Sequence, residues 1–439
     1  MLWRATARRY QVLGIRDFRL LVGDRLLAMS SVGFSLVGVS FAVLNVTGSP
    51  TDLSYVLAAQ IAPTLVFTLL GGVLADRISP QVVLIAANLA VMTGEGGFGI
   101  LVLTTHPPLW AMIALESLTG TGSAMLSPSQ QALLPRVVSP ELLQEASSIS
   151  RLGMNSGQMA GAAVGGLVVA AVGPGWALLA SGVCMSGTIP MLLSIRVRRS
   201  PADAMAREHQ PSMLRELREG WTEFRSHTWL WATVIQYCLT MMAWNAGFQV
   251  LGPVVARQHL GGPAAWGAIT ACEGVGLILG GIVSLRYTPR RPMMLVAGTG
   301  GALGLSPLAL GLSLPLAVIC VVAFALGALV EVMMVQWTVA MTTRIPSDKI
   351  ARVSSYDTLG SVCAMPIGAL VAGPLSAAIG VPSTEFAAAT LMAVVAALTF
   401  IPRDIRTIQS AAPLAAEPVA ATLPEGGSLA EETLATDAV

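Results

Sequence analysis

Lysine and arginine are confined to a few short segments of this chain, and those segments alternate with long apolar stretches. Of the 25 Lys and Arg residues, 23 fall in seven segments. These segments are Arg4–Arg25, Arg77, Arg136, Arg196–Arg225, Arg286–Arg291, Arg344–Arg352 and Arg403–Arg406. Each gap between them is long enough for two membrane crossings of roughly 20 residues each. Because cytoplasmic loops retain Lys and Arg, the pattern predicts twelve spans with both termini in the cytoplasm.

The loops at the opposite ends of these crossings support the same topology. Asn45–Leu53, Thr104–Leu109 and Gly311–Pro315 contain no Lys or Arg, and Arg257 is the single exception on that side. Charged residues make up 11% of the chain, against roughly 25% in soluble domains. We therefore expect a multi-pass membrane protein whose main surroundings are a lipid bilayer.

The predicted spans divide the chain into two halves. Their bounds are Leu20–Leu44, Leu53–Leu74, Val82–Leu103, Leu109–Leu133, Leu143–Val172, Trp176–Ile195, Leu230–Ala256, Ala264–Leu285, Pro292–Leu312, Leu316–Thr342, Val353–Ile379 and Thr384–Ile401. Residues 1–195 form the N-terminal six-helix half and residues 229–402 the C-terminal six-helix half. Residues 196–228 are a cytoplasmic linker, in which Met213–Phe224 has the spacing of an amphipathic surface helix. Residues 403–439 are expected to be a disordered cytoplasmic tail.

The two halves also repeat each other in sequence. The segment Leu70–Arg77 recurs 209 residues later as Leu279–Arg286, and Arg136 with the polar segment after it recurs 208 residues later at Arg344. Two matches at nearly one offset, each at a cytoplasmic loop, indicate duplication. Parallel repeats of this kind are typical of transporters whose substrate site lies between the halves near the midplane.

The loop after the second span resembles a motif of the major facilitator superfamily. Gly72, Asp76 and Arg77 match that motif. The family usually has Gly and two basic residues at the positions of Ser79, Pro80 and Gln81. The resemblance covers almost all of the chain before the tail. It implies an all-α membrane protein of twelve transmembrane helices in two parallel repeats, with Gly72, Asp76 and Arg77 as a conformational gate.

A narrower resemblance is to the bacterial exporter branch that includes enterobactin-type siderophore and macrolide exporters. It rests on Arg16–Leu21, Thr47–Pro50, Ala132–Leu143 and Arg215–Trp221. The fifth span also resembles the antiporter signature of the superfamily. That segment carries Gly157, Gly161, Gly165 and Gly166, with Ala162 in place of the usual Pro. A stripe of small residues equally favours close helix packing.

Four glutamates lie inside the predicted spans and away from the span ends, namely Glu95, Glu116, Glu273 and Glu331. An ionised acid at the centre of a membrane helix costs about 2.5–3.5 kcal/mol on insertion scales. These residues must therefore face a cavity, pair with a cation or hold a proton. The buried cation expected within reach is Arg151, and Glu273 is one potential partner for it.

Glu116 and Glu331 are the proton-coupling candidates, because the resemblance implies that the fourth and tenth spans line the transport cavity. Glu331 shares a helix face with Thr338 and Thr342, a polar stripe toward the cytoplasm. Glu95 and Glu273 are secondary intramembrane charges. We expect one of Glu116 and Glu331 to carry the proton, with Glu331 favoured, and the other to recognise cationic cargo.

The seventh span carries an aromatic stripe suited to a bulky solute. Tyr237, Trp244 and Phe248 lie at helical spacing, with Asn245 and Gln249 beside them. These five residues are the substrate-cavity candidates, although ordinary helix packing would explain the stripe as well. At span ends, we interpret Trp110, Trp176 and Trp266 as anchors at the membrane interface.

These observations predict a proton-coupled exporter of a bulky amphipathic small molecule, such as a siderophore, antibiotic or other secondary metabolite. The chain has no phosphate-binding loop, and its histidines and cysteines have no metal-ligand spacing. We therefore expect no enzymatic activity, cofactor, metal or nucleic-acid partner, and a monomer in the inner membrane of a bacterium. The alternatives are an uptake carrier or facilitator of the same fold, and a non-transporting membrane receptor or assembly partner.

Overall fold

The structure, a computed structural model, describes residues 11–75, 79–195, 213–287, 289–346 and 349–409. Every regular element in these ranges is a helix. The first group of long helices comprises α2 (Arg16–Thr47), α3 (Pro50–Ala75), α4 (Pro80–Thr104), α5 (Leu109–Val137), α6 (Leu143–Val172) and α7 (Pro174–Ser194). We call this group the first bundle. A short helix, α9 (Met213–Ser226), follows it.

The remaining helices form the second bundle. Its first rod runs through α10 (Thr228–Trp244), η2 (Asn245–Leu251), α11 (Gly252–Val255) and η3 (Ala256–Leu260). The other members are α12 (Pro263–Ser284), α13 (Pro292–Ala302), α14 (Leu305–Gly311), α15 (Leu316–Arg344), α16 (Ile350–Val362), α17 (Met365–Ile379), α18 (Val381–Thr399) and α19 (Arg403–Thr407). Proline occupies the first turn of α7, α12, α13 and α18, where its fixed φ and missing N–H suit a helix start.

Ten helices or continuous helical runs in the described residues are long and apolar enough to cross a membrane. Two more long helices of the first bundle, α3 and α5, are not among the ten. Helix α5 contains Glu116 together with several Ser, Thr and Gln residues, which lower its mean hydropathy. The chain is therefore a multi-pass helical membrane protein, and the count of twelve spans remains a prediction.

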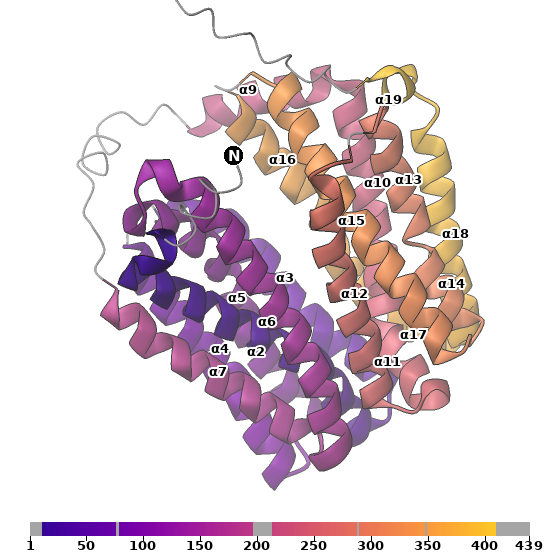
Figure 1. Cartoon of the computed structure of the whole chain (residues 1–439). Coiled ribbons are helices and arrows are strands. Elements are labelled where there is room, and N and C mark those ends of the chain that lie inside the picture. The colour runs from indigo at the N-terminus through magenta and orange to yellow at the C-terminus, as the bar shows by residue number, and fades with distance from the viewer. Residues whose placement is uncertain (1–10, 76–78, 196–212, 288, 347–348, 410–439) are drawn as a thin grey trace, which may run out of the picture.

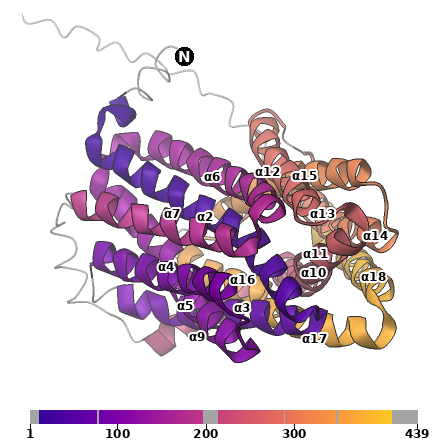
Figure 2. The same ribbon diagram turned by 90° about the horizontal axis from the view of Figure 1, so that it is seen from below.

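The bundles lie apart at the end that carries α9 and α19, and they meet at the opposite end (Figure 1). We call these the linker end and the far end. Figure 2 shows the two seams where the bundles meet, one between α6 and α12 and one between α3 and α17. At the first seam, a Cβ on Gly166 would lie 2.9 Å from Cα of Gly267. At the second, a Cβ on Gly373 would lie 2.5 Å from Oγ of Ser54.

The far end also holds Arg257, the one basic residue among the loops that otherwise contain no Lys or Arg. The guanidinium of Arg257, on η3, donates a hydrogen bond to the carbonyl oxygen of Leu44 in the last turn of α2. A cation at a helix C-terminus is favourable, because the last carbonyl groups have no partners within the helix. Arg257 therefore ties the second bundle to the first.

A helix, α9, is present at Met213–Ser226, and two of its aromatic residues contact the protein. Phe224 is 6% exposed, and the ring centroids of Trp221 and Tyr356 of α16 lie 5.5 Å apart. The amphipathic spacing therefore reflects docking on the second bundle as well as a surface location. The tail also begins later than expected, because Arg403–Thr407 form α19 and Ile405 is fully buried.

The prediction for one of the three tryptophan anchors is wrong. Trp110 and Trp176 are exposed, at 72% and 52%, as anchors at an interface should be. Trp266 is fully buried, and its ring centroid lies 4.9 Å from that of Phe248. The glycine at position 252 leaves room for this indole ring, so Trp266 belongs to the core.

Candidate functional site

An ion pair joins the two bundles. The guanidinium Nη1 of Arg151, on α6, lies 3.7 Å from Oε1 of Glu331, on α15. The Glu331 side chain is 15% exposed and the Arg151 side chain 71% exposed. The structure therefore corrects two expectations, because Arg151 is exposed rather than buried and its partner is Glu331. Among the described residues, Glu273 has no ion-pair partner and is half-buried on α12.

The glycine stripe of α6 packs within the first bundle. A Cβ on Gly157 would lie 2.5 Å from the carbonyl oxygen of Leu26. One turn further on, a Cβ on Gly161 would come still closer to the backbone of α2, and a Cβ on Gly165 would lie 3.2 Å from Cα of Phe34. Gly166 differs, since it faces α12 across the seam between the bundles. The stripe thus fixes α6 against α2, and only Gly166 contributes to the contact between bundles.

Glu116 lies in the interior of the first bundle beside Glu95. Glu95 is 1% exposed, and its Oε1 accepts a hydrogen bond of 2.5 Å from the hydroxyl of Ser35. Glu116 is fully buried, and neither of its carboxyl oxygens has a partner among the described residues. The two groups interact electrostatically. Two ionised carboxylates repel each other in an apolar interior, so the contact disfavours a state in which both groups carry a charge.

The aromatic residues of the seventh span pack inside the second bundle. The hydroxyl of Tyr237 donates to the carbonyl oxygen of Val296 at 3.0 Å, and Phe248 and Asn245 are 2% and 3% exposed. Trp244 stacks on Phe248, with ring centroids 5.2 Å apart, and Gln249 is half-buried. The stripe was predicted on regular α-helical spacing, whereas residues from Asn245 onward form the π-helix η2.

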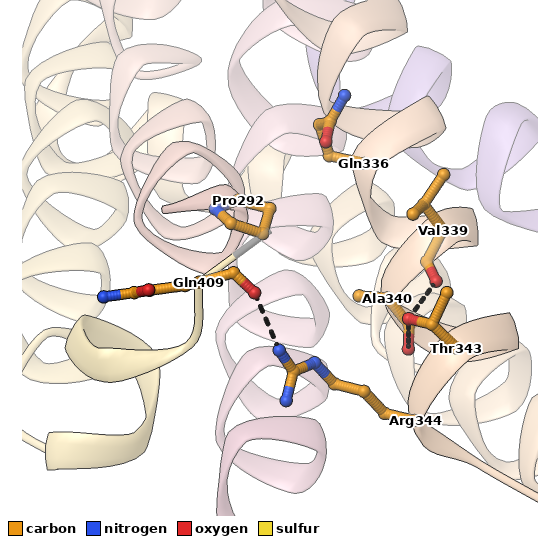
Figure 3. Close-up of a pocket in the computed structure, with 7 residues that line it drawn as sticks. All are labelled: Pro292, Gln336, Val339, Ala340, Thr343, Arg344 and Gln409. Atoms are coloured by element: carbon orange, nitrogen blue, oxygen red, sulfur yellow. Dashed lines mark hydrogen bonds between the residues drawn. The ribbon is translucent and has the colours of Figure 1, made fainter. Parts of the chain in front are cut away.

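Two of the pockets that the described residues form are small, and neither suits a bulky solute. One, of about 230 Å³, lies at the linker end of α15. Figure 3 shows Gln336, Thr343 and Arg344 around it, with Arg344 donating a 2.9 Å hydrogen bond to the carbonyl oxygen of Gln409. The other, of about 240 Å³, lies at the far end beside Arg257. Pockets for drug-sized ligands span roughly 300–1,000 Å³.

Three buried or half-buried acids were not among those identified from the sequence. Asp24, fully buried on α2, accepts a 3.4 Å hydrogen bond from Nδ2 of Asn88. Asp357, on α16, accepts one of 2.9 Å from the indole of Trp337. Glu385, on α18, is fully buried with both oxygens unpartnered among the described residues. Asp24 and Asp357 lie within the predicted spans Leu20–Leu44 and Val353–Ile379 but were not singled out there. Glu385 is the second residue of the predicted span Thr384–Ile401. The helix itself begins at Val381, as Pro382 in its first turn indicates, which places Glu385 further inside.

The loop motif after α3 lies largely outside the described residues. Gly72 is in the last turn of α3, which ends at Ala75, whereas Asp76 and Arg77 fall in the undescribed positions 76–78. Their role as a gate therefore remains a prediction.

Comparisons with known proteins agree with this architecture. The family model described as Major Facilitator Superfamily matches residues 26–355. The enterobactin exporter EntS of Escherichia coli (strain UTI89 / UPEC) is 26% identical over 367 residues, which cover 82% of this chain and 85% of the exporter. The same exporter from Escherichia coli O9:H4 (strain HS) is 25% identical with equal coverage.

Solved structures of transporters share the fold at low sequence identity. The nucleoside transporter NupG superposes with a TM-score of 0.70 and 11% identity, covering 88% of this chain and 99% of that one. A bacterial homologue of the human lysosomal transporter Spinster, in an inward-facing and unoccupied conformation, gives a TM-score of 0.65 and 15% identity. The match covers 88% of this chain and 96% of the Spinster homologue.

Proposed function

The chain belongs to the major facilitator superfamily, and we propose that it exports a bulky amphipathic small molecule in exchange for protons. In this proposal the bundles alternate between meeting at the far end and meeting at the linker end. The linker end faces the cytoplasm of a bacterial cell, because the basic loops gather there. The arrangement in Figure 1, with contact at the far end, is then the state that takes up cargo from the cytoplasm.

The observation that carries the proposal is the ion pair between Arg151 and Glu331. It bridges the bundles, so its formation and loss accompany their relative movement. A proton on Glu331 removes the negative charge and with it the attraction to Arg151. Solvent around Arg151 limits the stabilisation from such a pair to no more than about 1 kcal/mol. An interaction of this size can bias the equilibrium between two conformations and still be broken in every cycle.

The cargo class is supported by the exporter relatives. EntS, an enterobactin exporter, matches the chain over 367 residues at an identity of 26%. We therefore propose a siderophore or another secondary metabolite of comparable bulk as the cargo. The glycine stripe of α6, which resembles an antiporter signature, supports exchange with protons rather than facilitated uptake.

A double-mutant cycle at the ion pair tests this function. Purified protein in proteoliposomes is assayed for efflux of enterobactin and a small panel of amphipathic antibiotics under an imposed pH gradient. Glu331→Gln should abolish gradient-driven efflux and preserve cargo exchange without a gradient. Arg151→Gln should slow efflux. In cargo exchange without a gradient, where activity stays measurable, the double variant should match Glu331→Gln alone, because the two residues act through one interaction.

A matched control is Asp52→Asn, which removes an acid in the first turn of α3 at the far end and should leave efflux unchanged. Gradient-driven efflux at the wild-type rate in Glu331→Gln would overturn proton coupling at this residue. If the panel compounds instead accumulate on the linker-end side, the protein is an uptake carrier.

A further inference from the structure

Glu385 is a buried acid that the proposed transport cycle does not use. It is fully buried, and neither oxygen of its carboxyl group has a hydrogen-bond partner among the described residues. It follows the start of α18 at Val381 by four residues, which places it roughly 6 Å from the far end of that helix. This carboxyl group is therefore close to the surface at the far end yet shielded from water.

The helices around Glu385 supply no charge to balance it. Helix α18 packs against α10, η2, α13, α14 and α17, and none of these elements contains Asp, Glu, Lys, Arg or His. The titratable groups on them are Tyr237 and Cys238 of α10. Tyr237 bonds to the carbonyl oxygen of Val296, and Sγ of Cys238 lies 3.6 Å from Sγ of Cys363. An unpaired carboxylate is unfavourable in such surroundings, whereas a protonated carboxyl group is tolerated.

The carboxyl group rests on the backbone of η2. A Cβ on Gly247 would lie 2.7 Å from Oε2 of Glu385 and 2.9 Å from Cβ of Pro307, so only a glycine allows this approach. The same segment carries Asn245, which is buried and whose Oδ1 has no partner among the described residues. Segments of π-helix are rare and occur frequently at functional sites.

The segment η2 is also part of the contact between the bundles at the far end. Val250 and Leu251 pack in one apolar cluster with Val43 of α2 and Leu53 of α3. Further along the same rod, Arg257 bonds to the carbonyl oxygen of Leu44. Any movement of η2 relative to α18 would therefore disturb the surface that holds the bundles together at this end.

We propose that Glu385 is a second proton-binding site, which takes its proton from the far-end side and controls the contact between the bundles there. When a proton binds an Oε atom, the carboxyl group becomes a donor and can bond to an acceptor of η2, such as a backbone carbonyl or the amide oxygen of Asn245. That bond holds η2 on α18 and keeps the far end closed. Loss of the proton leaves only acceptors facing each other and releases η2. The inference rests on the proposed proton-coupled cycle for its physiological meaning.

Hydrogen–deuterium exchange of residues 245–260 in the purified full-length protein tests the inference, from about pH 5 to about pH 9. After correction for intrinsic exchange, wild-type exchange in this segment should rise several-fold toward high pH. Glu385→Gln, which mimics the neutral acid, should stay protected throughout. Gly247→Ala should exchange rapidly at both extremes, whereas the control Gly298→Ala, whose Cβ would lie 3.8 Å from the nearest atom, should behave as wild type.

A second readout keeps the test valid if a variant fails to fold. The infrared carboxyl band of the wild-type protein should titrate in this pH range, and Glu385→Gln should remove that component. A wild-type segment with constant protection across the range, or a response that follows sodium instead of protons, would overturn the inference. Glu331→Gln should keep the pH-dependent protection while losing gradient-driven efflux, so failure of the proposed function is seen separately.

Discussion

Carboxyl groups inside the bundles differ in what each one contacts, and this decides how each responds to a proton. Glu331 faces Arg151, and Glu95 accepts a bond from Ser35. Glu116 and Glu385 have no hydrogen-bond partner among the described residues. Protonation of a paired acid breaks an interaction, whereas protonation of an unpaired acid relieves a desolvated charge. The first kind can release a contact between elements, and the second kind can create one.

Replacing Glu116 with Gln should not destabilise the protein, because the neutral amide removes repulsion from Glu95. We expect the Tm of Glu116→Gln to equal or exceed that of the wild type at about pH 5 and to exceed it clearly at about pH 8, where a second carboxyl group would tend to ionise. Glu95→Gln is the matched comparison. A Tm difference that does not change with pH would show that the two acids do not interact.

The linker-end ion pair at Glu223 should respond to acid. A hydrogen bond from Lys349, with Nζ 2.9 Å from Oε2, lowers the pKa of Glu223; partial burial opposes the shift, and His227 contributes in the same direction as Lys349. A lowered pKa stabilises the docked form above the ordinary glutamate pKa. That stabilisation is lost as the pH falls through the lowered value.

Docking of α9 should therefore weaken at low pH, by less than about 1 kcal/mol because the pair is partly exposed. Limited proteolysis of the 213–226 segment across a pH series measures this, and Glu223→Gln should abolish the pH dependence. Glu141→Gln, which changes an exposed acid away from α9, is the control. If cleavage of the wild type is the same at every pH, the ion pair does not hold α9.

At the scale of helices, close packing depends on where glycine meets backbone. Gly157→Ala should destabilise the protein, because the added Cβ would lie 2.5 Å from the carbonyl oxygen of Leu26 and force α2 and α6 apart. Overpacking of this kind costs about 1–3 kcal/mol. Gly153→Ala, one turn earlier on the same helix with its nearest atom at 3.5 Å, is the control. Equal Tm values for both variants would contradict the packing described for α6.

The helices themselves could largely be predicted from the sequence. The expected span Leu316–Thr342 corresponds to α15 (Leu316–Arg344), since a long apolar run bounded by proline and arginine defines both ends. The irregular rod from Thr228 to Leu260 could not be predicted. Its π-helical segment η2 packs against α17, α18 and α3, and apolar periodicity along the chain does not encode such contacts. Trp266 was wrongly predicted to lie at the membrane interface for the same reason, because its burial depends on tertiary packing.

At the scale of the whole molecule, the contact between the bundles could not be predicted from the sequence. Charge and depth identified Arg151 and Glu331 separately as intramembrane charges. Their pairing depends on how α6 and α15 face each other across two separately packed bundles, so no spacing along the chain predicts it. Glu385 escaped notice because its span was expected to begin at Thr384, which left the acid at an edge rather than in the interior.

The orientation of the molecule can be checked directly. A reporter fused after Thr47 or after His106, both at the far end, should be found outside the cell, and one fused after Arg199 inside. These outcomes follow from the distribution of basic residues between loops. A reporter after Thr47 that is found in the cytoplasm would reverse the orientation and with it the proposed direction of transport.

The central claim is that cargo and protons exchange across the membrane through one cycle. Proteoliposomes that contain a pH-sensitive dye measure this most directly, with cargo added on the side of the linker end and no other driving force. The account predicts proton movement opposite to cargo, dependent on cargo concentration and absent in Glu331→Gln. Cargo flux without any accompanying proton movement in the wild-type protein would contradict it.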